Sequence, residues 1–213
     1  MTTRLRNERN RAQAVLGGIF AAAIVLLAPQ IAISGTIKGK VTASKAKFLK
    51  DTVVYIESIP EKEFPPPEAH ALIDQKGLEF VPHVLPVLAG TTVDFRNSDN
   101  VMHNVFTPDA IGDKFNLGSW PQHEMRSHTF TKSCEKACEA VMLCNVHPEM
   151  EAYVVVLTNP YFAVTDLEGN FTISDVPAGT YTLKTWHERL KESSQSVTVE
   201  SAGSVEVTME MKK

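Results

Sequence analysis

Short segments in which apolar and polar residues alternate recur along the chain from residue 36 to its end. Alternation with a period of two is typical of β-strands that have one buried face. Many short strands separated by turn signals predict an all-β protein built as a sandwich. We expect strands at Thr36–Thr42, Thr52–Glu57, Val93–Arg96, Ala152–Leu157, Phe171–Ser174, Thr180–Trp186, Ser196–Glu200 and Ser204–Met211.

Two breaks in composition divide this region. The segment Pro60–Pro67 contains four prolines among glutamate and lysine residues, which predicts an extended linker or crossover. A second break lies at Asn159-Pro160. We therefore expect a central domain over residues 69–158 and a second, discontinuous domain made from residues 35–60 and 160–213. No long window has a helical period, and Lys132–Met142 has room for one helical turn at most.

The first 34 residues have the pattern of a secretory signal peptide. Four arginines precede the fifteen-residue apolar run Ala14–Ala28, and the small residues Ala32-Ile33-Ser34 precede Gly35. A run of this length is shorter than a comfortable membrane span, although an uncleaved N-terminal anchor is the alternative. We expect a periplasmic or otherwise exported protein that has no membrane contact once the leader is removed.

The net charge of the chain limits the classes of partner that it is expected to bind. The formal net charge is −4, and loss of a leader that carries four arginines and one glutamate would change it to −7. Nucleic-acid binding requires clusters of basic residues that displace counterions, so this balance argues against it. The hydrophobic content of 43% is ordinary for a globular protein.

One short segment brings together three soft or borderline metal ligands: Cys144, His147 and Met150. A further histidine, His103, lies upstream. Two histidines, one cysteine and a weak axial methionine are the ligand set of a blue copper site. We therefore expect one type 1 copper ion held by these four residues. A metal-free site or one filled by zinc is the alternative.

The same segments resemble the cupredoxins of the plastocyanin and amicyanin group. The match covers about Ile73 to Leu157 and includes Gly90-Thr91-Thr92-Val93, His103-Asn104-Val105 and Cys144-x-x-His147-Pro148-x-Met150. This resemblance implies a Greek-key β-sandwich in which His103, Cys144 and His147 form a trigonal plane. It also implies that Asn104 hydrogen-bonds to the Cys144 loop. Pro148 would stiffen that loop by fixing its own φ angle.

The remaining cysteines, Cys134 and Cys138, depart from the family pattern. In an oxidising compartment we expect them to form a disulfide, with free or metal-binding thiols as the alternative. His70, His83, His123, His128 and His187 are interpreted as surface or hydrogen-bonded imidazoles. His123-Glu124-Met125 together with Met102 is a second hypothesis, an auxiliary copper-scavenging patch.

The C-terminal segment resembles the carboxypeptidase regulatory-like domains, which have a smaller, transthyretin-like β-sandwich. The matching motifs are Thr165-Asp166-x-x-Gly169-x-Phe171 and Val176-Pro177-x-Gly179-x-Tyr181. The first strands of this module are expected at Gly35–Val41 and Thr52–Ile56; assignment of Thr52–Glu57 to the cupredoxin is the alternative. The module has no nucleophile and base set, and Trp186 is interpreted as a half-buried packing residue.

These features predict a type 1 copper protein that carries single electrons between redox protein partners. The alternatives are a copper-handling module and a structural or adhesion protein without electron transfer. We expect no enzymatic activity, because an oxidase needs more copper centres than these ligands supply.

Overall fold

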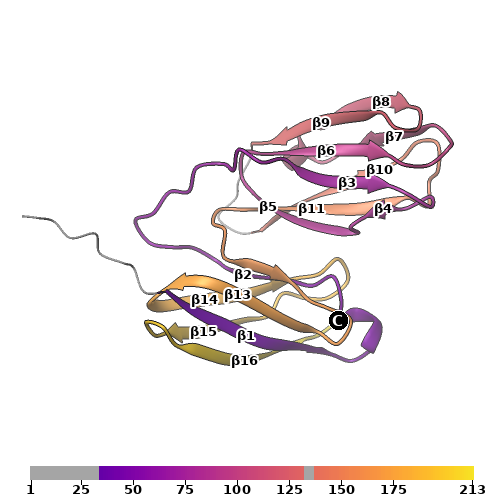
Figure 1. The fold of residues 1–213 in the computed structure, drawn as a ribbon. Coiled ribbons are helices and arrows are strands. Elements are labelled where there is room, and N and C mark those ends of the chain that lie inside the picture. The colour runs from indigo at the N-terminus through magenta and orange to yellow at the C-terminus, as the bar shows by residue number, and fades with distance from the viewer. Residues whose placement is uncertain (1–33, 132–136) are drawn as a thin grey trace, which may run out of the picture. The chain divides into compact units, whose positions relative to one another are not determined.

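The protein is described by a computed structural model that covers residues 34–131 and 137–213 (Figure 1). The predicted signal peptide, apart from Ser34, therefore lies outside the described residues. The described residues form one compact unit. Among the residues that are described, no helix is long and apolar enough to cross a membrane.

Strands dominate the described chain, and its only helical elements are two short 3-10 turns. The predicted all-β class is confirmed. The strands are β1 (Ser34–Ala43), β2 (Val53–Ile56), β3 (Ala71–Gln75), β4 (Phe80–Val81), β5 (Val84–Leu88), β6 (Thr91–Asn97), β7 (His103–Phe106), β8 (Asn116–Trp120), β9 (Met125–Phe130), β10 (Cys138–Leu143), β11 (Glu151–Leu157), β12 (Phe162–Val164), β13 (Asn170–Pro177), β14 (Gly179–Trp186), β15 (Ser194–Val199) and β16 (Ser204–Met211), with 3-10 turns η1 (Ala46–Phe48) and η2 (Ala110–Gly112).

The strands pair into four sheets. Sheets β5-β11-β10-β7-β8 and β4-β3-β6-β9 share one hydrophobic core, which includes Phe95, Trp120 and Val154. We call this pair of sheets the ligand sandwich. Sheets β13-β1-β16 and β12-β2-β14-β15 share another core, which includes Ile37 and Leu183, and form the flanking sandwich.

Strand β2 pairs antiparallel with β12 and β14, so it belongs to the flanking sandwich and not to the ligand sandwich. Strand β1 lies between β13 and β16 and runs parallel to β16. The segment from residue 57 to 70, which joins β2 to β3, contains no strand. The exact limits of the two domains stay a prediction.

Strand β11 is buried on both faces, which explains its nearly continuous apolar sequence. Ala152, Val154 and Val156 pack into the core of the ligand sandwich. Val155 and Leu157 belong to a separate cluster that includes Val53 and Tyr55 of the flanking sandwich, with Tyr153 and Trp186 packed against it. We call this cluster the junction. It joins the two sandwiches by burial of apolar side chains.

The sequence pattern did not predict several strands of the ligand sandwich. We expected at most one helical turn in Lys132–Met142. Residues 138–142 of this segment instead form the first part of strand β10. Its alternate residues Cys138, Ala140 and Met142 are buried, and six residues pair with β11. Pairing with a neighbouring strand thus decided a segment whose local composition was ambiguous.

Candidate metal centre

His103 is the first residue of β7, and its side chain is completely buried. The strand holds it in register opposite Trp120 of β8. Burial of an imidazole requires hydrogen-bond partners or a metal, because the ring nitrogens lose their contact with water. The position of His103 therefore already indicates a specific role for both ring nitrogens.

The segment Cys144–Met150 is the loop between β10 and β11, and we call it the ligand loop. The pair Leu143 and Glu151 closes it at its base. Inside the loop, the Met150 N–H donates a hydrogen bond to the His147 carbonyl oxygen, 3.0 Å away. This is the hydrogen bond of a β-turn with Pro148 at its second position, where a fixed φ angle favours the turn. The loop therefore reverses direction between His147 and Met150.

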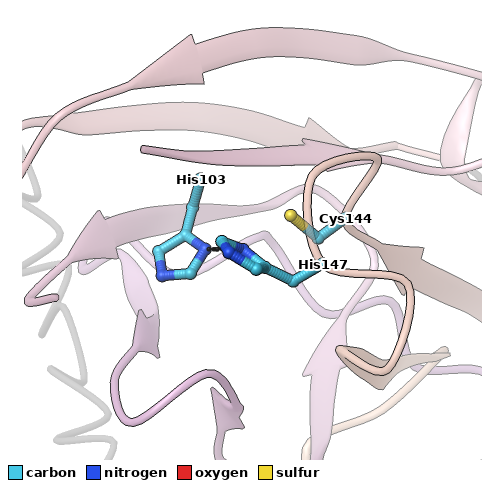
Figure 2. A group of neighbouring side chains, drawn as sticks. All are labelled: His103, Cys144 and His147. Carbon is cyan, nitrogen blue, oxygen red and sulfur yellow. Dashed lines mark hydrogen bonds between the residues drawn. The ribbon is translucent and has the colours of Figure 1, made fainter. Parts of the chain in front are cut away.

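His103, Cys144 and His147 converge, as Figure 2 shows. One ligand atom from each of the three lies within 4.8 Å of the others. The Nδ1 atoms of His103 and His147 are 3.0 Å apart. Cys144 is a free cysteine and is buried, whereas His147 is only half-buried. The sequence pattern predicted that these residues would meet although 41 positions separate His103 from Cys144.

Asp99 sets the orientation of the His103 ring. Its Oδ2 atom lies 2.9 Å from Nε2 of His103, and its two oxygens also accept the N–H groups of Gly77 and Leu78 at 2.7 and 2.9 Å. Burial raises the pKa of Asp99, but the hydrogen bonds from Leu78, Gly77 and His103 outweigh this effect and lower it overall. An ionised Asp99 accepts the Nε2 proton of His103, which leaves Nδ1 with its lone pair facing Cys144 and His147.

Asn104 connects the two segments that carry the ligands. Its Oδ1 accepts the Asn145 N–H at 3.2 Å, and its own N–H points at the Cys144 Sγ at 3.5 Å. Its Nδ2 donates to Asn116 Oδ1 and Gly118 O, each 2.8 Å away. The side chain thus has partners for its donors and its acceptor.

Met150 is 1% exposed and belongs to the same core as Cys144. Its backbone is held by the turn described above, which includes the predicted loop residue Pro148. The role of Met150 as axial ligand stays a prediction. The predicted Cys134–Cys138 disulfide also stays a prediction, because Cys134 lies outside the described residues.

The donor set is one that copper can use, and zinc uses the same kinds of ligand. A thiolate and two imidazoles suit both Cu(I) and Cu(II), and a trigonal Cys and His₂ arrangement is typical of blue copper sites. An ion bound at roughly 2.0–2.3 Å from nitrogen and sulfur ligands needs donors within about 4 to 5 Å of one another. The three donors meet this requirement, and the Nδ1 lone pair that Asp99 leaves on His103 is oriented for coordination.

Exposed apolar side chains lie next to the ligands in sequence. Val101 and Met102 immediately precede His103, and Val146 immediately precedes His147; they are 40%, 46% and 47% exposed. Single exposed apolar side chains are ordinary on protein surfaces, but these three flank two of the candidate ligands in the sequence. We call these three residues the apolar rim.

The five other histidines lie outside the metal centre, and the Nε2 atom of one of them, His128, is buried without a hydrogen-bond partner among the described residues. His70 pairs with Asp94, and the ring of His128 lies on that of Phe115 with the centroids 4.0 Å apart. Burial lowers the pKa of His128 and that of His187. His123 is exposed, as are Met102 and Met125, and the auxiliary copper-scavenging patch stays a prediction.

Sequence reasoning missed the structural role of Asn97 and of Asp99. Asn97 is fully buried, and its Nδ2 donates to the carbonyls of Val101 and Trp120. Its Oδ1 accepts the N–H of Asp99, which forms a local turn. The spacing Asn97-x-Asp99 is a weak turn signal in the sequence. Nothing local indicates that the Asp99 carboxylate reaches both His103 and the turn between β3 and β4.

Known proteins resemble parts of this chain. Residues 152–207 match a family model described as polysaccharide lyase family 4, domain II. This match covers less than half of the chain. No curated protein has a matching sequence. The carboxypeptidase regulatory-like resemblance therefore stays a prediction.

Among solved structures, a purple cupredoxin from Nitrosopumilus maritimus is 25% identical, with 40% of this chain and 98% of that chain covered and a TM-score of 0.35. A mutant of amicyanin in its reduced Cu(I) form is 25% identical, with 48% and 97% covered and a TM-score of 0.37. A copper-containing nitrite reductase from Thermus scotoductus is 23% identical, with 56% and 28% covered and a TM-score of 0.39. Because all three TM-scores are below 0.5, the proposals for this protein rest on its own residues and not on these likenesses.

Proposed function

We propose that the protein binds one type 1 copper ion at His103, Cys144 and His147, with Met150 on the axial side, and carries single electrons. The observation that supports this most directly is the convergence of two imidazole nitrogens and a buried free thiol within 4.8 Å. When bound, copper supplies a one-electron couple between Cu(II) and Cu(I).

The surrounding residues favour a site that changes little between oxidation states. Asp99 fixes the His103 ring, and Asn104 ties the backbone of Asn145 to β7. The base of the ligand loop is the strand pair between β10 and β11. Ligands held by packed strands and by hydrogen bonds keep their positions, which lowers the structural reorganisation that accompanies electron transfer.

His147 is the half-buried ligand and lies beside the apolar rim. An apolar surface around a partly exposed ligand suits brief contact with a partner, because it desolvates easily and imposes few ion pairs. We infer that a redox protein docks on this rim and exchanges an electron through the His147 ring. The negative mature charge calculated from the sequence favours a partner with a basic surface.

Copper handling without electron transfer is the second candidate. The exposed thioethers of Met102 and Met125 support it, because such groups bind Cu(I) weakly and exchange it readily. Both candidates assign the protein to the periplasm or another exported location, and neither includes an enzymatic reaction.

The test begins with the purified mature chain and added Cu(II). We expect an intense visible band from charge transfer between the Cys144 thiolate and copper. The Cys144→Ala variant should lose it, whereas Glu149→Gln, a change at an exposed position of the same loop, should keep it. A colourless wild-type protein, or a coloured Cys144→Ala variant, would refute the type 1 site.

Cyclic voltammetry then separates the two candidates. A reversible one-electron wave with fast electrode kinetics supports the electron carrier. Loss of copper during the reductive sweep supports copper handling instead.

A further inference from the structure

His83 lies between the residue that follows the ligand loop, Glu151, and the flanking sandwich. This histidine lies between β4 and β5 and is outside the group that converges on the metal centre. Its Nδ1 atom lies 3.0 Å from the carbonyl oxygen of Glu151. Because a carbonyl oxygen only accepts hydrogen bonds, Nδ1 must carry the proton. The other ring nitrogen, Nε2, is then directed elsewhere.

That second nitrogen faces the flanking sandwich. His83 Nε2 is 3.7 Å from Oε1 of Glu188, which follows β14 and whose side chain is only 16% exposed. The same Glu188 oxygen also accepts the Arg189 Nε–H at 3.1 Å. When the ring carries a second proton, on Nε2, it forms an ion pair with the Glu188 carboxylate of the flanking sandwich while Nδ1 donates to the Glu151 carbonyl of the ligand sandwich, and in this state His83 bridges the two.

The carbonyl that His83 contacts belongs to Glu151, at the end of the ligand loop. Glu151 directly follows Met150 and is paired with Leu143 at the base of the ligand loop. The Glu151 carboxylate accepts the Tyr153 hydroxyl at 2.7 Å, and the Tyr153 N–H donates to the His83 carbonyl at 2.8 Å. Burial raises the pKa of Tyr153, as do its hydrogen bond with Glu151 and the charge of Glu188, so the phenol stays a donor.

The apolar junction makes this bridge a rigid one. Val155 and Leu157 are 0% and 2% exposed, and the rings of Tyr153 and Trp186 pack with their centroids 5.4 Å apart. Beside the bridge lies a cavity of about 440 Å³ whose walls come from both sandwiches and include Met150 and Glu188. A packed interface passes a small displacement on to its neighbours, because interiors have little room to absorb it.

We propose that Glu188 is a positioning residue for the ligand loop: acting through His83, it fixes the Glu151 carbonyl and hence the axial, Met150 side of the metal centre. The flanking sandwich then adjusts the copper site in addition to any spacing or docking role. This inference rests on the proposed copper function. Its test therefore includes a measurement on the metal-free protein.

Three variants of the full mature chain separate the parts of the bridge. Glu188→Gln removes the charge but keeps the shape of the side chain. His83→Phe removes both ring nitrogens but keeps a ring against Tyr153, whose centroid lies 5.6 Å away. Glu192→Gln is the matched control, because Glu192 contacts Lys184 and Tyr55 of the flanking sandwich but no residue of the bridge.

In the metal-free protein, NMR would follow hydrogen exchange of the Met150 and Tyr153 amides. We expect Glu188→Gln and His83→Phe to speed this exchange about three- to tenfold, the effect of weakening one hydrogen bond on local opening. Glu192→Gln should leave it unchanged. Glu188 also acts directly on Tyr153. We expect the double variant to exchange no faster than His83→Phe alone, and faster exchange in the double variant would overturn the route through His83.

In the copper-loaded protein, Glu188→Gln should change the intensity ratio of the visible charge-transfer bands and shift the reduction potential, and Glu192→Gln should change neither. Unchanged exchange in metal-free Glu188→Gln would overturn the bridge. Faster exchange with an unchanged spectrum and potential would overturn its influence on the axial side. A wild-type chain that binds no copper would refute the proposed function, while the metal-free exchange would still decide whether the bridge holds the loop.

Discussion

Asn104 and Asn145 form a direct link between the two segments that carry the candidate ligands. The Oδ1 atom of Asn104 accepts the N–H of Asn145 at 3.2 Å, so β7 and the ligand loop are held together by an amide buried to 3% exposure. The link lies one residue after His103 and one after Cys144. It therefore fixes the separation of two donors independently of any metal.

Asn104→Ala should loosen the ligand loop. The change removes the hydrogen bonds to the Asn145 N–H and the Gly118 carbonyl, and a typical hydrogen bond contributes about 0.5–1.5 kcal/mol to stability. We expect a lower free energy of unfolding in urea and faster loss of bound copper to a chelator. Asn116→Ala is the control, because it removes another partner of the same amide but keeps the link to Asn145. Equal copper loss from the two variants would contradict this role.

Asp99→Asn should weaken metal binding although Asp99 is not a ligand. An amide oxygen accepts the Nε2 proton of His103 more weakly than a carboxylate does. The ring is therefore held less firmly in the orientation in which its Nδ1 lone pair can bind a metal. Removal of such outer partners typically lowers metal affinity by about 10- to 100-fold. A competition titration with a copper chelator would measure this. Asp94→Asn, which alters a carboxylate paired with His70 and Ser127, should bind copper as the wild type does.

Acid should remove a stabilising contribution from Asp74. Burial raises the pKa of its carboxyl, but hydrogen bonds from Arg96 and Ser98 and the charge of Arg96 outweigh this and lower it. Because the folded-state pKa lies below the unfolded value of about 3.9, the contribution is fully present above that pH and is lost as pH falls through the folded-state pKa.

We therefore expect Asp74→Asn to cost about 1 kcal/mol near neutral pH, a modest value because the Arg96 side chain is 47% exposed. The difference from the wild type should shrink in urea denaturation curves taken below about pH 3.5. A difference that stays constant between neutral pH and about pH 3 would show that the ion pair does not stabilise the fold.

Leu157→Ala should reveal how strongly the junction stabilises the protein. Leu157 is 2% exposed and lies among side chains from both sandwiches. Burial of this kind predicts a loss of about 2–5 kcal/mol. Leu167→Ala at a 72% exposed turn position is the matched control and should change stability by less than about 0.5 kcal/mol. Similar denaturation midpoints for the two variants would mean that the junction does not hold the sandwiches together.

Parts of the fold could be predicted because their cause is local. Turn residues and alternating strands fixed the positions of β1, β13, β14 and β16, and Gly169 adopts the positive φ of 83° that its turn required. Strands β7 to β10 could not be predicted in this way. The residues of β7, β8 and β9 are mostly polar or aromatic without strict alternation, whereas β10 is mostly apolar, and all four form strands because neighbouring strands pair with them.

The sequence by itself determined the all-β class and the residue types that could hold a soft metal, since the spacing of Cys144, His147 and Met150 depends only on one short loop. The sequence also predicted His103 as a ligand, from its resemblance to the cupredoxins, but only the tertiary structure brought its ring to Cys144 and His147, oriented that ring with Asp99 and placed His83 between Glu151 and Glu188. The physical reason is that these contacts join residues far apart in the chain. Only the pairing and packing of whole sheets brings such residues within hydrogen-bond distance.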